Sequence, residues 1–532
     1  MDAFSSFNLQ PYSGEWNIGK AAHLLRRTTF GPTRDEILDA ASEGMYNVVN
    51  RLLEARPLPD PPINFYYEGD PNVAIGETWI DAPYTRSDNS NAIIQSRLNS
   101  LNAWITGLTL EEGVNIREKM TLFWHNHFVT GDIRDARFVY RNLDLYRRNA
   151  LGNFRELTKA VTVDPAMLVY LNGNQNTYLQ PNENYARELL ELFTIGKGPA
   201  AAEGDYTNYT EHDVAAIAKV LTGWRDTGYF SRNGEEIGTV FRSRLHDPSA
   251  KSLSHRFGKA IIPNLGNQEY AYLIDIIFRQ DEVARFIVRK IYRWFVYYEI
   301  NEKIESTIIQ PLSELLIKEN YEIKPVIEML LLSDHFYDPY AVGSMIKNPL
   351  DFSASLIRQL QIELGDQQVN KYEVWRRIYG LNDLQQMAYF SPPNVAGWKA
   401  YYQQPLYYRT WINSSTLSFR SILTLLAVNG IRINRFRLQA DLLGFIRNLP
   451  GSDDPNTLID QLIMIFLPYD LAEEQKDYLK SVLLPGLPDY EWTTEYNRYL
   501  NNPGDNLLRE AVLKKLRDLV MALLVLPEFQ LS

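Results

Sequence analysis

The sequence predicts a mainly α-helical protein: a large multi-helix globular body with a long irregular insert and a smaller C-terminal helical subdomain. Along most of the chain, apolar residues recur with the 3.6-residue period of amphipathic helices. Hydrophobic residues make up 45% of the chain and charged residues 22%, which is the composition of a globular protein rather than a disordered one. A chain of 532 residues can also bury a large core without disulfides, and this chain has no cysteine.

The expected helices follow this periodicity in chain order. A short helix over residues 21–27 ends before Gly31-Pro32. The next helix begins after Thr33, because Thr33 and Glu36 have the spacing of a capping box. Further helices are predicted over residues 91–110, 114–128, 154–163, 184–193, 211–224, 270–278, 282–298, 302–319 and 507–525. We expect Pro311 to break the helix over residues 302–319, because proline lacks the N–H that a helix interior needs.

Two segments interrupt the helical pattern. Residues 57–92 are rich in Pro, Asp and Asn, and we expect a long irregular excursion at the surface. Residues 227–262 contain many Gly, Ser and Asn residues, which favours a small β-hairpin or an ordered loop. We expect a helical core over residues 1–425 and a C-terminal helical subdomain over residues 426–532.

Charge and composition restrict the function. Acidic side chains outnumber basic ones by 65 to 54, which argues against a nucleic-acid partner because phosphate binding needs a surplus of Lys and Arg. The lack of cysteine excludes thiolate catalysis, Fe–S clusters and Cys-ligated zinc, so a divalent metal would need His, Asp and Glu ligands. No apolar run is long enough for a transmembrane helix, and the first residues lack a signal-peptide pattern. We therefore expect a soluble protein that is cytoplasmic by default.

The first candidate site is His125-Asn126-His127, at the end of an apolar run. Histidines at positions i and i+2 share a face on extended backbone, where both can bind one metal ion. On a helix the two side chains lie about 200° apart, so a metal site requires the backbone to unwind near His125. The alternative is a pair of hydrogen-bonding histidines at the end of a helix.

The second candidate site lies on a predicted helix that opens with a proline. Asn184, Glu188 and Glu191 share one face of this helix at positions i, i+4 and i+7, and they could supply ligands or an acid/base pair. Glu183 and Arg187 have the i, i+4 spacing of an ion pair. Solvated charges on a helix surface are the alternative, although the many apolar neighbours favour burial of these carboxylates.

Two further segments carry groups that can act in a site. His246, Asp247 and Lys251 lie together in an irregular segment, and loops often present functional groups, although the Asp-Pro step after His246 also simply favours a turn. Trp398 begins an aromatic segment that extends to Trp411. If this segment is exposed it can stack on a sugar or a protein partner, and if it is buried it is part of the core.

The chain contains a series of different short motifs. In order they are Ala22–Arg27 with Phe30-Gly31-Pro32, Phe123–Phe128, Gly152–Arg155, Asp164–Met167, Pro181–Asn184 with Ala186–Glu188, Leu192-Phe193 with Gly196, Leu221–Trp224, His246-Asp247 with Lys251, and Pro392–Val395 with Gly397-Trp398. By these motifs the chain resembles the large bacterial proteins grouped as domain-of-unknown-function family 1800. The motifs span residues 21–420, most of the chain. One departure follows Trp398, where the family often has a Gly-Gly pair before a Trp and this chain has Lys399-Ala400.

The resemblance implies a helical fold without a named activity. It also implies that relatives are often exported, which leaves the compartment open. Their genes often lie beside an uncharacterised family that looks like sulfatases, which suggests a protein partner encoded nearby. The resemblance also implies that the polar residues of the motifs are joint candidates for a functional site. They are His125, Asn126, His127, Asn182, Glu183, Asn184, Arg187, Glu188, His246, Asp247 and Lys251.

Two hypotheses follow. In the first, a metal-dependent, hydrolase-like site uses a divalent metal held by His125, His127 and His246. Its catalytic groups are Glu188, Arg187, Asp247 and Lys251, with the carboxylates as ligand or general base and the cations holding an anionic substrate group. Its substrate-binding residues are Asn126, Asn182, Glu183, Asn184 and Trp398. In the second hypothesis, the protein is a non-catalytic binding or assembly module, and the same polar residues form a buried structural network.

Overall fold

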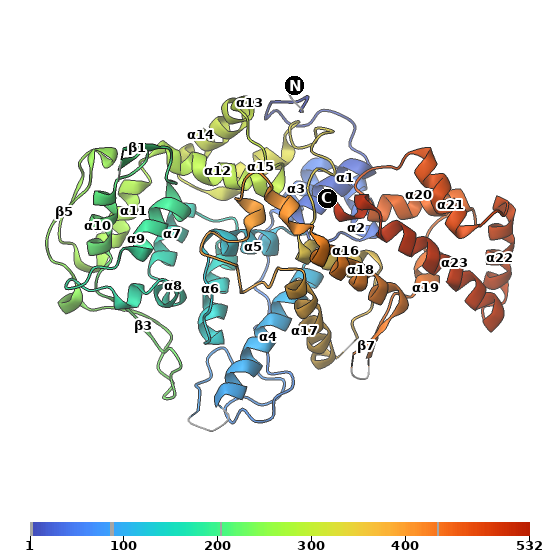
Figure 1. Cartoon of the computed structure of the whole chain (residues 1–532), viewed down its shortest axis with the longest axis horizontal. Coiled ribbons are helices and arrows are strands. Elements are labelled where there is room, and N and C mark those ends of the chain that lie inside the picture. Colours follow the sequence, from blue (N-terminus) through green and yellow to red (C-terminus); the bar gives the residue numbers. More distant parts are fainter. Residues whose placement is uncertain (1–3, 86–89, 203–204, 366, 434–435) are drawn as a thin grey trace.

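The computed structural model describes residues 4–85, 90–202, 205–365, 367–433 and 436–532. It is mainly helical with a few short strands, so the predicted fold class is confirmed (Figure 1). The helices of the first part of the chain are α1 (Ile18–Thr28), α2 (Arg34–Glu43), α3 (Met45–Leu52), α4 (Ser90–Glu111), α5 (Arg117–His127), α6 (Ala136–Arg148), α7 (Phe154–Thr162), α8 (Pro165–Tyr170), α9 (Glu183–Glu188) and α10 (Glu211–Val220).

The remaining helices are α11 (Glu269–Ile277), α12 (Asp281–Phe295), α13 (Glu302–Ile304), α14 (Gln310–Lys318), α15 (Ile323–Leu332), α16 (Pro349–Gln359), α17 (Gln368–Leu384), α18 (Ser414–Asn429), α19 (Leu442–Arg447), α20 (Pro455–Phe466), α21 (Glu473–Leu483), α22 (Asp489–Asn501) and α23 (Asn506–Leu524). The strands form antiparallel two-stranded hairpins, which pair β1 (Ala200–Ala202) with β2 (Asp205–Tyr206), β3 (Trp224–Thr227) with β4 (Gly238–Phe241), β5 (Lys251–Ser252) with β6 (Ile261–Ile262), and β7 (Ile431–Ile433) with β8 (Phe436–Leu438).

Local sequence signals account for several helix ends. The capping box at the start of α2 is present, since Thr33 Oγ1 accepts a hydrogen bond from Glu36 N and the Glu36 carboxylate accepts one from Thr33 N. The helix predicted over residues 302–319 is divided into α13 and α14 by a wider π turn over Glu305–Ile309. Pro311 follows this turn and lies in the first turn of α14, where its missing N–H matters least.

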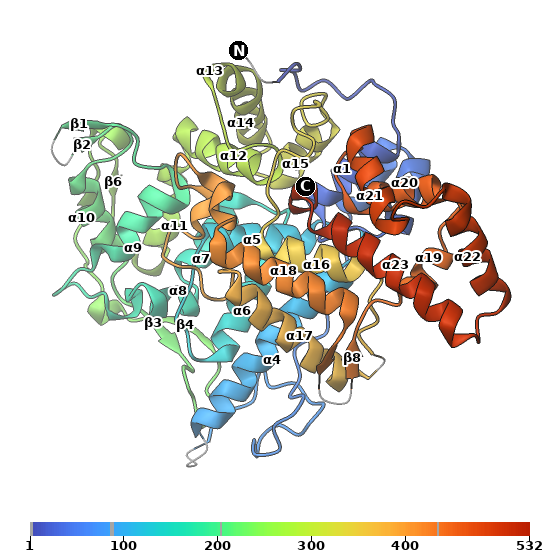
Figure 2. The ribbon, with the colours of Figure 1, turned by 45° about the vertical axis from the view of Figure 1, so that its right-hand side comes forward.

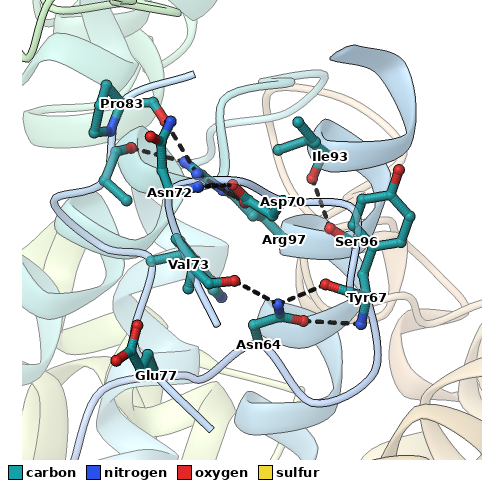
Figure 3. A network of polar contacts seen from close by, with 12 residues as sticks. Asn64, Tyr67, Asp70, Asn72, Val73, Glu77, Pro83, Ile93, Ser96 and Arg97 are labelled. Atoms are coloured by element: carbon teal, nitrogen blue, oxygen red, sulfur yellow. Dashed lines mark hydrogen bonds and ion pairs between the residues drawn. The ribbon is translucent and has the colours of Figure 1, made fainter. Parts of the chain in front are cut away.

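The segment over residues 57–92 is irregular, as predicted, although residues 86–89 lie outside the described residues. Polar contacts fix its path: Arg97 Nε donates to Asp70 Oδ2 at 2.9 Å, and Asn64 Nδ2 donates to Val73 O at 2.9 Å (Figure 3). The prediction of a purely surface excursion is wrong, because several of its large side chains are part of the core, namely Phe65, Val73, Trp79 and Tyr84.

The views in Figures 1 and 2 place helices α19–α23 at one end of the molecule and α10, α11 and the β5 hairpin at the opposite end, with α5 between them. Hydrogen bonds connect the C-terminal helices to the rest of the protein. Arg26 Nη2 of α1 donates to Met464 O, and Gln359 Nε2 of α16 donates to Ile465 O. The predicted division between residues 425 and 426 falls inside α18 and stays a prediction. None of the described helices combines the length and the apolar character that crossing a membrane requires.

Candidate functional site

Helix α5 stays regular through His127, and this separates the two histidines of the first candidate site. His125 Nε2 lies 2.7 Å from Tyr389 O, whereas His127 Nε2 lies 3.0 Å from Phe193 O. The predicted unwinding near His125 does not occur, because the helical i→i−4 bonds continue up to the bond from Phe128 N to Trp124 O. The two rings therefore face different parts of the protein and do not meet at one point.

The buried His127 forms a cluster with the half-buried Lys290 of helix α12. After α9 the backbone forms a π turn over Leu189–Thr194, and two of its carbonyls accept hydrogen bonds from outside the helix. Lys290 Nζ donates to Leu192 O at 2.9 Å, and His127 Nε2 donates to Phe193 O. Lys290 Nζ also lies 3.0 Å from His127 Nδ1. Because Nε2 carries the hydrogen, the lone pair of Nδ1 faces the lysine.

Burial determines the protonation of His125, His127 and Lys290. It lowers the pKa of His125 to about 4, and together with the nearby Lys290 it lowers the pKa of His127 well below its ordinary value. Burial, with a smaller effect of Arg293, lowers the pKa of Lys290 to about 7. Both histidines are therefore neutral at pH 7, and the lysine is close to half protonated.

The third candidate site forms a closed network around Glu269, the first residue of helix α11. His246 Nε2 lies 3.0 Å from Glu269 Oε1, and Lys251 Nζ donates to Glu269 Oε2 at 2.7 Å. Lys251 Nζ also donates to Asp247 O. On the other side of the ring, His246 Nδ1 lies 3.0 Å from Thr222 O. The three side chains that carry these contacts, those of His246, Lys251 and Glu269, are buried, and Thr222 and Asp247 contribute backbone oxygens.

Both ring nitrogens of His246 have partners within the protein. Nδ1 lies 3.0 Å from Thr222 O and 3.1 Å from the Thr222 hydroxyl, and Nε2 lies 3.0 Å from Glu269 Oε1. Glu269 Oε1 also accepts a hydrogen bond from Leu265 N. Neither nitrogen of His246 is therefore open to a further ligand.

The second candidate site is a helix surface with one strong ion pair. Arg187 makes a two-pronged contact with Glu211, with both nitrogen–oxygen distances at 2.7 Å, and a longer contact of 3.4 Å with Glu183. The predicted Glu183–Arg187 pair is thus present but secondary. Asn182 caps α9 by accepting a hydrogen bond from Asn184 N. These residues hold helix α9 against the start of α10 and do not face the histidines.

Glu188 is half-buried, and burial followed by repulsion from Glu191 raises its pKa. Its carboxylate accepts no hydrogen bond from any residue that the structure describes. Glu191, in contrast, accepts one from the Tyr209 hydroxyl at 3.0 Å. The stripe formed by Asn184, Glu188 and Glu191 therefore does not act as one polar unit.

Asn126 and Trp398, both predicted to bind substrate, contact each other through the backbone of a loop. Asn126 Oδ1 accepts a hydrogen bond from Trp398 N at 3.0 Å. Gly397 has φ +89°, and a Cβ there would lie 2.4 Å from the same oxygen, so only glycine allows this contact. Trp398 is buried among core residues, so the aromatic segment is largely packing rather than an open surface.

Comparison with known proteins agrees with the resemblance seen in the motifs. The family described as "Protein of unknown function (DUF1800)" matches residues 23–531, nearly the whole chain. The chain belongs to this family. No curated protein and no solved structure matches it. The motif residues can therefore be interpreted as family features, while their chemistry must come from the contacts of this chain.

The structure does not bring the three predicted metal ligands together. His125, His127 and His246 have separate sets of partners, and within the described parts of the chain no group of three His, Asp and Glu side chains is placed to hold a metal ion. It does bring together His246 and Lys251, joined by Glu269. Sequence reasoning missed Glu269 and Lys290, because each lies on a helix without any local motif, whereas Thr222 lies in a family motif and could have been suspected.

Proposed function

We propose that this protein is a binding or assembly module whose polar family motifs form buried structural networks. The observation that carries the proposal is the engagement of the ring nitrogens of His127 and His246. A metal ligand must offer an imidazole lone pair. Both nitrogens of His246 are engaged by Thr222 and Glu269, and the lone pair of His127 Nδ1 faces Lys290.

Helix α18 supports a binding role, because it presents apolar side chains outward. Leu417, Ile422 and Leu425 are 43%, 45% and 48% exposed, and they lie on the solvent side of this helix. A row of large apolar side chains on one helix face is a common feature of surfaces that contact another protein. The partner that we propose is the sulfatase-like protein encoded beside many members of the family.

A metal-binding experiment tests the structural role of the histidines. The purified protein is incubated with Zn²⁺, desalted and analysed by elemental analysis, in parallel with His127→Gln and with the exposed control His212→Gln. We expect less than stoichiometric zinc in all three proteins. Stoichiometric zinc that is lost only in His127→Gln would contradict the proposal.

Co-expression with the neighbouring sulfatase-like protein tests the assembly role. We expect the two proteins to co-purify, and the double variant Leu417→Asp, Leu425→Asp to lose the complex while keeping its fold. The control is Leu507→Asp, which changes an 85% exposed leucine at the start of α23. A complex that survives the α18 changes, or no complex with the wild-type chain, rejects the proposed partner surface.

A further inference from the structure

A small, partly enclosed cavity lies where helices α1, α5 and α16 meet the aromatic turns that precede α18. Its volume is about 20 Å³, and its charged side chains are Arg26, Arg27, Lys119 and Asp351, with Ser532 also in the lining. Both arginines come from the family motif over residues 22–27. The three cations are buried, with 6% exposure or less. None of the polar networks described above contains any of these four side chains.

Further positive charge lies behind the cavity wall. Lys347 is buried and donates to Phe529 O at 2.8 Å, and Arg420 is buried and donates to Lys347 O at 2.7 Å. Asp351 contacts Lys119 directly. Among the described side chains, it is the one carboxylate that raises the pKa of any of the five cations, which are Arg26, Arg27, Lys119, Lys347 and Arg420. Five buried cations therefore lie near a single side-chain carboxylate.

Several nitrogens of the lining residues have no hydrogen-bond partner. They are Arg26 Nε, Arg27 Nε, Arg27 Nη1 and Trp294 Nε1, and all of them are donors. The remaining guanidinium contacts go to neutral oxygens, as when Arg26 Nη2 donates to Met464 O and Arg27 Nη2 donates to Ser344 Oγ. A buried donor without an acceptor costs free energy, and more so when it is charged. The cavity thus combines surplus positive charge with unpartnered donors.

We propose that this cavity binds a small inorganic anion of the size of chloride. The volume admits one or two atoms of water size and excludes a nucleotide or a peptide. A halide accepts several N–H donors at once and offsets the uncompensated charge of the two arginines. This site is independent of the proposed assembly function, because its charged side chains are buried, whereas the proposed partner surface is the exposed face of α18.

Burial effects on the surrounding groups agree with this electrostatic environment. Burial lowers the pKa of Arg26 and of Arg27 to about 10 and that of Arg420 to about 9, and it lowers the pKa of Lys347 well below its ordinary range. An anion among these groups favours their charged forms. It also joins α1 to α16 and to the C-terminal helices that Arg26 contacts.

Thermal unfolding in chloride tests the site. Sodium chloride is raised from 1 to 300 mM while sodium gluconate, whose anion is too large for the cavity, keeps the ionic strength constant. We expect Tm to rise by about 1–3 °C for each tenfold increase in chloride above its Kd. The same salts should leave the Tm of Arg27→Met independent of chloride. A Tm that depends on total ionic strength alone, or a larger rise with sulfate than with chloride, overturns the proposal.

The matched control is Arg97→Met, which removes another buried guanidinium that Asp70 already neutralises. This variant should be less stable but keep the chloride dependence of the wild type. If both arginine variants lose the dependence, the cavity is not its source. A measurement without variants keeps the proposal testable if Arg27→Met does not fold: crystals soaked in sodium bromide should show one anomalous peak beside Arg27, and no peak there rejects the site.

Ser532, the last residue of the chain, also lines the cavity, and its carboxylate is a competing occupant. A chain extended by two neutral residues after Ser532 separates the two cases. If the halide is the occupant, the extended chain keeps the chloride dependence of its Tm. If the carboxylate is the occupant, chloride dependence appears only after the extension, and the proposal fails for the chain that ends at Ser532.

Discussion

Two buried histidine–lysine clusters of this protein differ by one carboxylate. In the first, Lys290 Nζ contacts His127 Nδ1 and the carbonyl of Leu192, and all of its partners are neutral. In the second, His246 and Lys251 lie on either oxygen of Glu269, at 3.0 and 2.7 Å. The residue types match, and both clusters lie beside family motifs.

The difference lies in the charge that faces each cation. Within the described part of the chain no carboxylate contacts Lys290, and burial lowers its pKa to about 7 beside a neutral imidazole. In the second cluster the Glu269 carboxylate contacts both His246 and Lys251. The predictions below break or sharpen this contrast, beginning with the largest expected effect.

Glu269→Gln should cost the most. The change leaves Lys251 buried without its negative partner, and breaking a buried ion pair from one side costs about 3–5 kcal/mol. The free energy of unfolding from urea denaturation measures the loss. Glu282→Gln is a control with a partly exposed carboxylate that contacts Arg289. Equal losses in the two variants would mean that Glu269 has no special role.

Lys290→Met should flatten the pH dependence of stability. The folded pKa of Lys290 is about 7, while an unfolded lysine has a pKa near 10.4, so between these values the unfolded chain binds more protons and stability rises with pH. The stability cost of burying Lys290 is full below pH 7, falls as the pH rises from 7 to 10.4, and is absent above 10.4. From pH 7 to 9 we expect the wild type to gain about 1–2 kcal/mol relative to Lys290→Met.

The control for this prediction is Lys318→Met, whose side chain is 77% exposed and which should follow the pH dependence of the wild type. The measurement is the free energy of unfolding in urea at pH 7, 8 and 9. Parallel curves for the wild type and Lys290→Met would show that Lys290 titrates as an ordinary lysine.

Thr222→Val should weaken the second cluster moderately. The Thr222 hydroxyl accepts a hydrogen bond from Asp247 N at 2.9 Å and donates to Lys219 O, and valine keeps its shape while removing both bonds. We expect a loss of about 1–2 kcal/mol in the free energy of unfolding. Thr493→Val, which removes one exposed hydrogen bond to Asp453 O, should cost less. A loss no larger than that of this control would argue against a closed network.

Glu188→Gln should have the smallest effect. The folded pKa of Glu188 is raised, so the folded state is favoured below the unfolded pKa and this contribution is lost as the pH rises through the folded pKa. Glutamine imitates the protonated form, and we expect it to be within about 0.5 kcal/mol of the wild type and slightly more stable at pH 7. This advantage should vanish near pH 4. A large loss on substitution would point to a partner of Glu188 that its contacts do not reveal.

Local signals allowed several features to be predicted from the sequence. The capping box of Thr33 and Glu36 and the ion pair of Glu183 and Arg187 depend on residues three or four positions apart, and both are present. The Lys290–His127 and Glu269–His246 contacts could not be predicted from the sequence. Each joins two segments that are far apart in the chain, and neither Lys290 nor Glu269 lies in a motif. Motif membership marked His127 and His246 without showing which atoms they face.

The sequence by itself determined the helical class, the main helices and the family. Helical periodicity and capping depend on neighbouring residues, so they can be recognised without knowledge of the packing. Tertiary structure alone decided that His125 and His127 point apart, that Glu269 holds His246 and Lys251, and that Arg26 and Arg27 share a cavity with Lys119. Charges of buried groups depend on what lies across the interface between elements, and the linear order of residues does not contain that information.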